Sequence, residues 1–178
     1  MEHAGVDLWA PKSTFNRMAR AAGCGFRPRF KDPVLWHART RKRVGYFGAV
    51  RLRDGRFVFR AETGKCNEAS FFQFLRQLRQ ASRRTGRGVV IITDHAPYHP
   101  SRLHKPWRER QADHFALDFL PAYSPALNPS ERMWKLTRRR CLHHRYFPNL
   151  DEVTSAVETE FATGTTRNEA LRRLCAIT

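Results

Sequence analysis

Acidic residues are scarce in this chain of 178 residues, which holds 16 Asp and Glu against 33 Lys and Arg and has a net charge of +17. Such a charge costs self-repulsion in the compact state and favours a polyanionic partner. A basic bias of the whole proteome would also raise the arginine count, so the charge alone leaves both explanations open. The hydrophobic content of 41%, with 13 Phe and 4 Trp, excludes wholesale disorder.

Cysteine is also rare, and its four copies form no Cys-x-x-Cys pair: Cys24, Cys66, Cys141 and Cys175. This spacing argues against a zinc knuckle and gives no support to a disulfide framework. No apolar run approaches the ~20 residues that span a bilayer, and the first residues include Glu2 and lack the apolar core of a signal peptide. We therefore expect one cytoplasmic domain without a membrane partner.

Strand and helix signals alternate from residue 44 onward. Val44–Leu52 and Arg56–Glu62 are rich in aromatic and β-branched residues, and Asp54-Gly55 between them predicts a hairpin. Asn67 is placed to cap a helix that ends near Arg84. The later candidates are strands at Val89–Thr93 and Phe115–Leu120 and helices at His104–Asp113, Ser130–His143, Leu150–Thr163 and Thr166–Cys175. This order predicts an α/β fold in which helices pack on a mixed sheet.

Two carboxylates stand at the ends of such elements. Asp94 follows the apolar run Val89–Thr93, and ligands gather beyond the carboxyl ends of strands in open α/β sheets. Glu131 lies in the first turn of the helix that begins near Ser130. Two such carboxylates can hold divalent metal for phosphoryl chemistry.

Each carboxylate also has a purely structural interpretation. Asp94 could cap nearby backbone amides in a turn. Asn128, Pro129 and Glu131 have the spacing of an N-cap, a first helical residue and a capping-box acid, so Glu131 could fold back on the Asn128 amide. The two roles of Glu131 are compatible, because the start of the helix also fixes where its carboxylate points.

The helix from Ser130 is basic, and no acid interrupts the chain between Arg132 and Leu150. A solvated face would usually mix both signs, so this pattern favours a surface that tracks phosphates. The histidines that follow Asp94 lack zinc-site spacing and are interpreted as loop residues or phosphate contacts. The candidate nucleic-acid contacts are therefore His95, His99, Arg132, Lys135, Arg138 and Arg139.

Together these segments resemble a known family. The run TDHAPYH, followed by FLPAYSPALNPSERMWKLTRRR, is similar to the DDE transposase domain of the mariner-like superfamily, in particular its bacterial insertion-sequence branch. The family pattern, a strand end D-N/H-x-x-x-H and then LPPYSPxLNPIExxWxxxK, is matched in order by Pro121, Tyr123, Ser124, Pro125, Leu127, Asn128, Pro129, Glu131 and Trp134. The resemblance covers roughly residues 31–160.

The resemblance implies an RNase H-like fold whose three acids bind two Mg²⁺ or Mn²⁺ ions for DNA cleavage and strand transfer. Asp94 corresponds to the second acid and Glu131 to the third, with Asn128 positioning Glu131. The family's first Asp lies on the first strand, usually in an Asp-Glu pair. Upstream of Lys31 this chain has no such pair, and Asp7 is the sole aspartate there.

The expected domains are an atypical segment at residues 1–30 and a partial, N-terminally truncated DDE domain at 31–178. Either residues 5–10 replace the first central strand or the sheet lacks it. The sequence leaves open whether the chain is an enzyme of DNA transposition or a non-catalytic, basic DNA-binding remnant. The resemblance implies transposon ends and target DNA as partners, a homodimer, and a place at the bacterial nucleoid.

Overall fold

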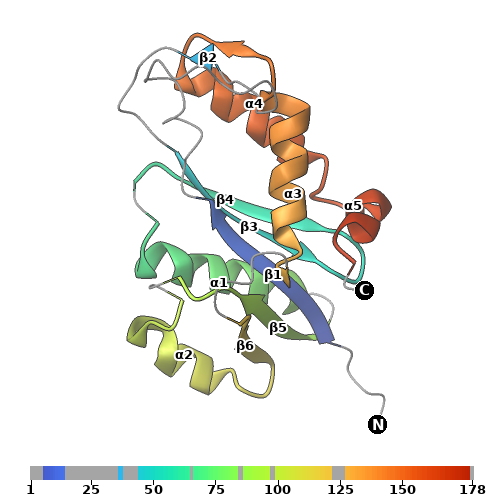
Figure 1. Ribbon diagram of the computed structural model, residues 1–178. Coiled ribbons are helices and arrows are strands. Elements are labelled where there is room, and N and C mark those ends of the chain that lie inside the picture. Colours follow the sequence, from blue (N-terminus) through green and yellow to red (C-terminus); the bar gives the residue numbers. More distant parts are fainter. Residues whose placement is uncertain are drawn as a thin grey trace.

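A mixed five-stranded sheet runs through the molecule and carries helices on both faces (Figure 1). The computed structural model describes residues 6–14, 36–37, 44–64, 66–83, 86–96, 99–121 and 127–176. The strand order is β4-β3-β1-β5-β6. The α/β fold with helices flanking a mixed sheet is therefore confirmed. Within the described ranges, no helix is both long and apolar enough to cross a bilayer.

The expected hairpin is present as β3 (Gly45–Arg51) and β4 (Phe57–Glu62), which pair antiparallel. Gly55 lies in the turn between them with φ +70°, a backbone conformation that costs glycine little. The turn is tied back by a hydrogen bond from the Gly55 amide to the Arg51 carbonyl, at 2.8 Å. Local turn chemistry thus sets the register of this half of the sheet.

Strand β1 (Val6–Thr14) occupies the centre of the sheet. It pairs antiparallel with β3 and parallel with β5 (Gly88–Thr93). Of the two alternatives that the sequence leaves open, the structure has the first, because residues 6–10 supply a central strand. Trp9 and Ala10 are fully buried there.

The crossover from β5 to β6 (Phe115–Phe119) is parallel, as expected. It passes through the 3-10 turn η1 (Arg102–His104) and the short helix α2 (Lys105–Arg110). Strand β5 therefore lies between β1 and β6, and Asp94 follows directly after its carboxyl end.

Helix α1 (Glu68–Arg83) covers one face of the sheet. Its start has reciprocal capping, in which Asn67 Oδ1 accepts from the Ser70 amide and Ser70 Oγ accepts from the Asn67 amide, each at 2.9 Å. The buried residues of the helix are Ser70, Phe71, Phe74, Leu75, Leu78 and Ser82. The apolar ones pack with Trp9, Phe47 and Ile91 of the sheet.

The opposite face is covered by α3 (Ser130–Thr137), α4 (Leu150–Ala162) and α5 (Glu169–Leu174). Their core is built around Trp134, Phe57 and Phe161, whose rings meet edge-on or tilted at 5.0–6.3 Å. A small parallel pair, β2 (Trp36–His37) with β7 (Tyr146–Phe147), stands outside the main sheet.

The helix expected over residues 130–143 changes character after Thr137. Residues Arg138–Leu142 form a π-helical segment, η3, in which the His143 amide bonds the Arg138 carbonyl. The side chains of Thr137 and Cys141 bond carbonyls four residues back, a pattern that bends and loosens helices. The segment ends at Leu142, and His144 in the turn that follows has a φ of +56°.

Candidate active site at the carboxyl end of strand β5

Asp94 lies immediately beyond β5, and 47% of its side chain is exposed. Its neighbour is His99, whose Nδ1 is 3.0 Å from Asp94 Oδ1 and 2.6 Å from the Asp94 backbone oxygen. Since a carbonyl oxygen only accepts, the short contact places the proton on Nδ1. His99 therefore ties both the carboxylate and the backbone of Asp94 to the turn that follows β5.

His99 itself is buried, with 1% of its side chain exposed. Its ring lies 4.3 Å from that of Phe71 on α1, and its Nδ1 is also 3.0 Å from Thr93 Oγ1. These contacts give His99 partners within the fold instead of the nucleic acid expected from the sequence. His95 is exposed and stacks on Phe119 at 5.0 Å.

Glu131 lies half-buried in the first turn of α3. The buried Asn128 fixes that turn, because its Oδ1 accepts from the Ser130 amide at 3.1 Å and from Ser130 Oγ at 2.8 Å. The helix begins at Ser130, as expected, but Pro129 and not Asn128 holds the cap position. Residues 122–126 of the family pattern lie outside the described residues.

Arg132 is engaged inside the molecule. Its Nη1 donates to the carbonyl oxygens of Leu174 at 3.1 Å and Ala176 at 2.7 Å. Cys175 adds a bond from its Sγ to the Pro129 carbonyl at 3.3 Å, and burial raises the pKa of this thiol to about 11. The end of α5 is thus bound to the start of α3 through Arg132 and Cys175. Nothing local in the sequence signals this contact between residues more than 40 positions apart.

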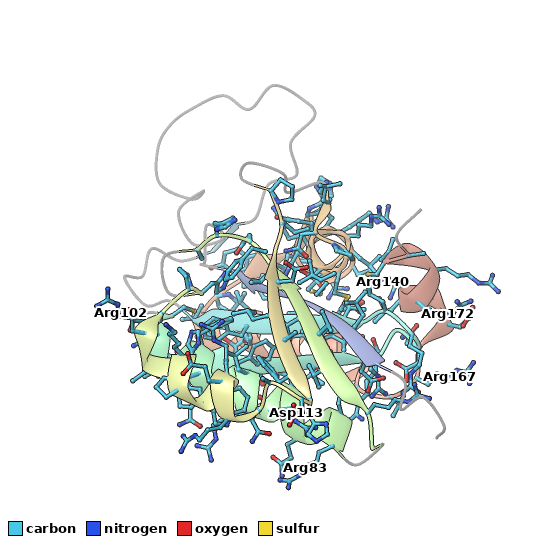
Figure 2. All side chains as sticks on the ribbon, turned by 90° about the horizontal axis from the view of Figure 1, so that it is seen from below. Arg83, Arg102, Asp113, Arg140, Arg167 and Arg172 are labelled. Carbon is cyan, nitrogen blue, oxygen red and sulfur yellow. The ribbon has the colours of Figure 1, made fainter. Side chains whose placement is uncertain are left out.

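Directly after α3, a basic group begins in η3, and His143 is its one half-buried member while the others are exposed. We name it the α3 basic end: Arg138, Arg139, His143, His144 and Arg145. Burial, followed by the charges of His144, Arg138 and Arg139, holds the pKa of His143 below its ordinary value. By contrast, Arg140 is paired with Glu160 at 3.0 Å. In Figure 2, Arg83 and Arg102 point outward from the rim of the molecule. Lys135 is also exposed.

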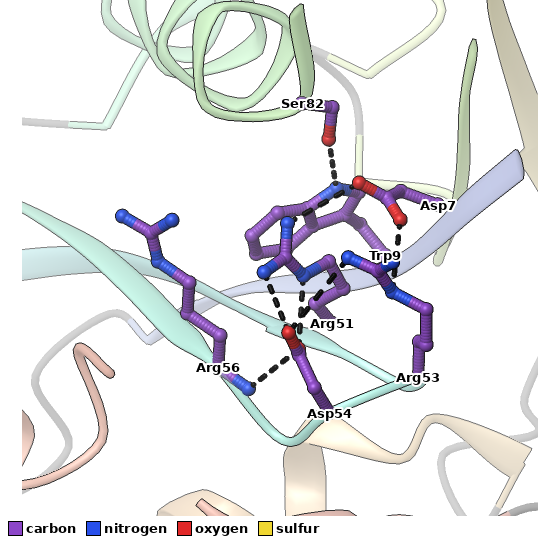
Figure 3. Close-up of polar contacts among 7 residues, drawn as sticks. All are labelled: Asp7, Trp9, Arg51, Arg53, Asp54, Arg56 and Ser82. Atoms are coloured by element: carbon purple, nitrogen blue, oxygen red, sulfur yellow. Dashed lines mark hydrogen bonds and ion pairs between the residues drawn. The ribbon is translucent and has the colours of Figure 1, made fainter. Parts of the chain in front are cut away.

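Asp7 forms a different cluster, at the other end of β1 (Figure 3). Its side chain is fully buried and pairs with Arg51 at 3.2 Å and with Arg53 at 3.3 Å. Arg51 also holds Asp54, at 2.9 and 2.6 Å, and lies 5.3 Å from the centre of the Trp9 ring. Trp9 in turn donates from Nε1 to Ser82 Oγ on α1 at 3.0 Å. The cluster fastens β1 to the hairpin and to α1.

Asp7 and Asp94 lie at different levels along the sheet. Asp7 pairs with Val89, five residues before Asp94, which is roughly 16 Å along a strand at 3.3 Å per residue. Asp7 also shares a sheet face with Trp9, two residues on, which packs against α1. Asp7 therefore does not take the place of the family's first acid in this structure.

Protonation of Asp54 in acid should weaken its ion pairs with Arg51 and Arg53 in the Asp7 cluster. Burial alone would raise the pKa of Asp54, but hydrogen bonds from Arg51 and the Arg56 amide, with the charges of Arg51 and Arg53, lower it below 3.8. Because the folded pKa is the lower one, ionised Asp54 stabilises the fold above pH 3.8, and this contribution is lost as the pH falls through the folded pKa.

We expect Asp54→Asn to lower the Tm at neutral pH and the difference from the parent to shrink toward zero in strong acid. Melting both proteins across this pH range checks the expectation. A difference that does not change with pH would contradict it.

The donor set does not fit a complete three-acid metal site. Among the residues that the structure describes, no group of three or more His, Cys, Asp or Glu side chains is placed to hold a metal ion. Asp94 follows the end of β5, and Glu131 lies in the first turn of α3. Asp7 pairs with Arg51 and Arg53 near the amino end of β1. The described residues therefore offer no complete ligand set for a pair of metal ions.

Solved structures place this fold among the RNase H-like transposase domains. The catalytic domain of the Mos1 mariner transposase matches 97% of this chain and 76% of that one, with a TM-score of 0.60 and 19% identity. A Mos1 mariner paired-end complex with Mn matches 97% of this chain and 52% of that one, with a TM-score of 0.62 and 19% identity. At this level of identity the likeness concerns the fold.

The sequence comparisons then give the family. The family model described as DDE superfamily endonuclease matches residues 9–154, and the chain belongs to this family. The transposable element Tc1 transposase of Caenorhabditis elegans is 28% identical over 150 residues, covering 75% of this chain and 50% of that protein. The uncharacterized protein y4pE/y4sA of Sinorhizobium fredii (strain NBRC 101917 / NGR234) is 35% identical over 71 residues, covering 39% and 48%. The chain thus spans about half the length of these relatives, and the expected DDE transposase fold is confirmed.

Proposed function

We propose that this chain acts in DNA transposition as the DNA-binding part of a DDE domain, with its contacts along α3. The observation that carries the proposal is the α3 basic end, where Arg138 and Arg139 are exposed and make no ion pair in the described part of the chain. Exposed arginines without acidic partners are free to neutralise phosphates. Lys135 and His95 are the further candidate contacts, from the same helix and from the residue after Asp94.

Asp94 and Glu131 are the proposed metal ligands, for Mg²⁺ or Mn²⁺. Support comes from their places, at the carboxyl end of β5 and in the first turn of α3, and from the family to which the chain belongs. A solved Mos1 complex is a paired-end complex with Mn. By analogy we propose transposon ends and target DNA as binding partners and a homodimer as the assembly. We also propose residues 31–178 as the body of the domain, to which β1 adds a strand.

Of the two functions that the sequence leaves open, the incomplete acid set favours the non-catalytic one. Strand β1 carries a single carboxylate, Asp7, and that residue is paired with Arg51 and Arg53. DNA binding through arginines needs no metal, whereas phosphodiester cleavage by two metals needs ligands for both. We therefore propose binding without cleavage for this chain.

Salt-dependent DNA binding tests the proposal. The parent and the double variant Arg138→Ala/Arg139→Ala are titrated with duplex DNA in EDTA at several salt concentrations. We expect the double variant to bind more weakly and the slope of log K against log salt to fall in magnitude by about 2, one for each lost phosphate contact. Arg140→Ala is the matched control, because Arg140 is already paired with Glu160 and should change the slope little.

Two outcomes would contradict this assignment. The first is a parent that does not bind DNA at low salt. The second is an Arg140→Ala slope that falls as much as the slope of a single Arg138→Ala variant, because the loss would then report net charge and not a defined surface.

A further inference from the structure

We infer that Tyr146 on β7 stacks on an unpaired base of the bound DNA, next to the arginines that contact its phosphates. The inference rests on the proposed DNA binding by the α3 basic end and specifies the form of DNA that this surface takes. It predicts a preference for DNA with unpaired nucleotides over fully paired duplex.

The side chain of Tyr146 is directed to solvent by the way β7 is anchored. Among the large hydrophobic side chains in the described ranges, it has the greatest exposed fraction, 67%. The next residue, Phe147, is 6% exposed and belongs to the same core cluster as Cys141 and Leu142 of η3. Because successive side chains of a strand point to opposite sides, burial of Phe147 turns the Tyr146 ring outward.

The path of the chain keeps Tyr146 close to the α3 basic end. The His143 amide donates to the Arg138 carbonyl at 2.9 Å, so residue 143 lies against the first residue of η3. Tyr146 follows three residues after His143, and an extended chain covers at most about 11 Å in that many residues. A DNA strand rises about 3.4 Å per nucleotide, so the arginines and the ring can contact one short stretch of it.

The chemistry of this segment suits a single strand. Residues 138–146 contain no acid, and Arg139, Arg145 and Tyr146 are all exposed. Cations that follow the backbone, together with an aromatic ring on which a base stacks, are the combination that binds single-stranded nucleic acid. In a duplex each base is already stacked between its neighbours, so the ring meets an available base only where the DNA is unpaired.

Strand β7 also holds the ring in position before DNA binds. Tyr146 pairs with Trp36 and Phe147 with His37 in the parallel ladder with β2, and β7 contacts α4 as well. An aromatic side chain on a backbone fixed in this way loses little conformational freedom when it stacks on a ligand. The exposed ring is therefore a prepared contact and not a mobile one.

Binding of labelled DNA in EDTA tests the inference with a blunt duplex, the same duplex with a single-stranded thymine overhang, and that duplex with an abasic overhang. The abasic overhang keeps the phosphates and lacks the bases. We expect the parent to bind the thymine overhang about 5- to 150-fold more tightly than the abasic one, the range for stacking of one base. Tyr146→Ala should lose this preference, and Tyr146→Phe should keep it.

The salt dependence separates stacking from charge. Tyr146→Ala removes no charge, so its slope of log K against log salt should equal that of the parent. The double variant Arg138→Ala/Arg139→Ala should show the opposite pattern, with a smaller slope and an unchanged ratio between the two overhangs.

Leu103→Ala is the matched control for loss of an exposed apolar side chain. Leu103 is 51% exposed and lies in η1, which leads into α2 at the opposite end of the molecule from β2 (Figure 1). This variant should change neither the ratio between the overhangs nor the slope.

Two results would overturn the inference: a parent that binds the thymine and abasic overhangs equally, or a Tyr146→Ala variant that keeps the preference. If Tyr146→Ala does not fold, Tyr146→Thr is measured in its place, because threonine suits a strand and has no ring. A parent that binds no probe at low salt overturns the proposed DNA binding together with this inference. A parent whose slope depends on Arg138 and Arg139, but which has no preference for thymine, overturns this inference alone.

Discussion

Asp7→Ala is expected to lower the free energy of unfolding by about 3 kcal/mol. The substitution removes a fully buried carboxylate and leaves Arg51, which is itself almost fully buried, with one acidic partner in place of two. Breaking a buried ion pair from one side costs about 3–5 kcal/mol, and the low end applies because Asp54 still holds Arg51. Urea unfolding of the parent and the variant gives the difference.

Arg53→Ala is the matched control for this result. Arg53 also pairs with Asp7, but 40% of its side chain is exposed, so solvent already screens the pair. Its loss should cost below about 1 kcal/mol. Equal costs for the two variants would show that the cluster does not act as a buried anchor of β1.

Gly55→Ala is expected to cost at least about 3 kcal/mol, through two independent effects. Gly55 has φ +70°, which an L-residue adopts at a cost of about 1–2 kcal/mol. A Cβ at this position would also overlap with the Asn168 carbonyl oxygen and the Arg172 amide nitrogen at the start of α5. Both are backbone atoms, so relief requires the hairpin turn and α5 to separate.

Two other glycines separate the conformational cost of a positive φ from the cost of the steric overlap. Gly86 has φ +67° with open space around its Cβ position, so Gly86→Ala should show the conformational cost alone, about 1–2 kcal/mol. Gly64 has neither a positive φ nor a close neighbour, so Gly64→Ala should be nearly neutral. Chemical denaturation of the three variants should rank Gly55 above Gly86 above Gly64, and a Gly55→Ala cost no larger than that of Gly86→Ala would exclude the overlap.

The elements that the sequence predicts well are those whose signals are local. The hairpin follows from Asp54-Gly55 between two β-rich segments, and α1 follows from its Asn67 cap and a buried apolar stripe. Strand β1 is different, because Pro11 and Lys12 are poor strand residues and only pairing with β3 and β5 on both sides makes the segment extended. Strands β2 and β7, of two residues each, have no pattern of their own.

The same distinction holds for the candidate site. Asp94 and Glu131 lie at the strand and helix ends that the sequence predicts, and the Asn128 side chain accepts from the first helical amide although Pro129 holds the cap position. Sequence reasoning treated Arg132 and His99 as nucleic-acid contacts, since charge and spacing do not reveal partners that arrive from α5 and α1. These partners are set by tertiary packing, which no local window contains.

The central position of β1 affects how the sheet assembles while the chain is being synthesised. Val6 pairs with Gly88, so the β5-facing edge of β1 waits for a partner that is made 82 residues later. At about 5–20 residues per second, ribosomes leave it unpaired for roughly 4–16 s. During that interval the edge of β1 that pairs with β5 is open, and an open strand edge recruits other chains. Slower initiation or a holding chaperone should therefore raise the soluble yield, because each lowers the chance that two waiting strands meet.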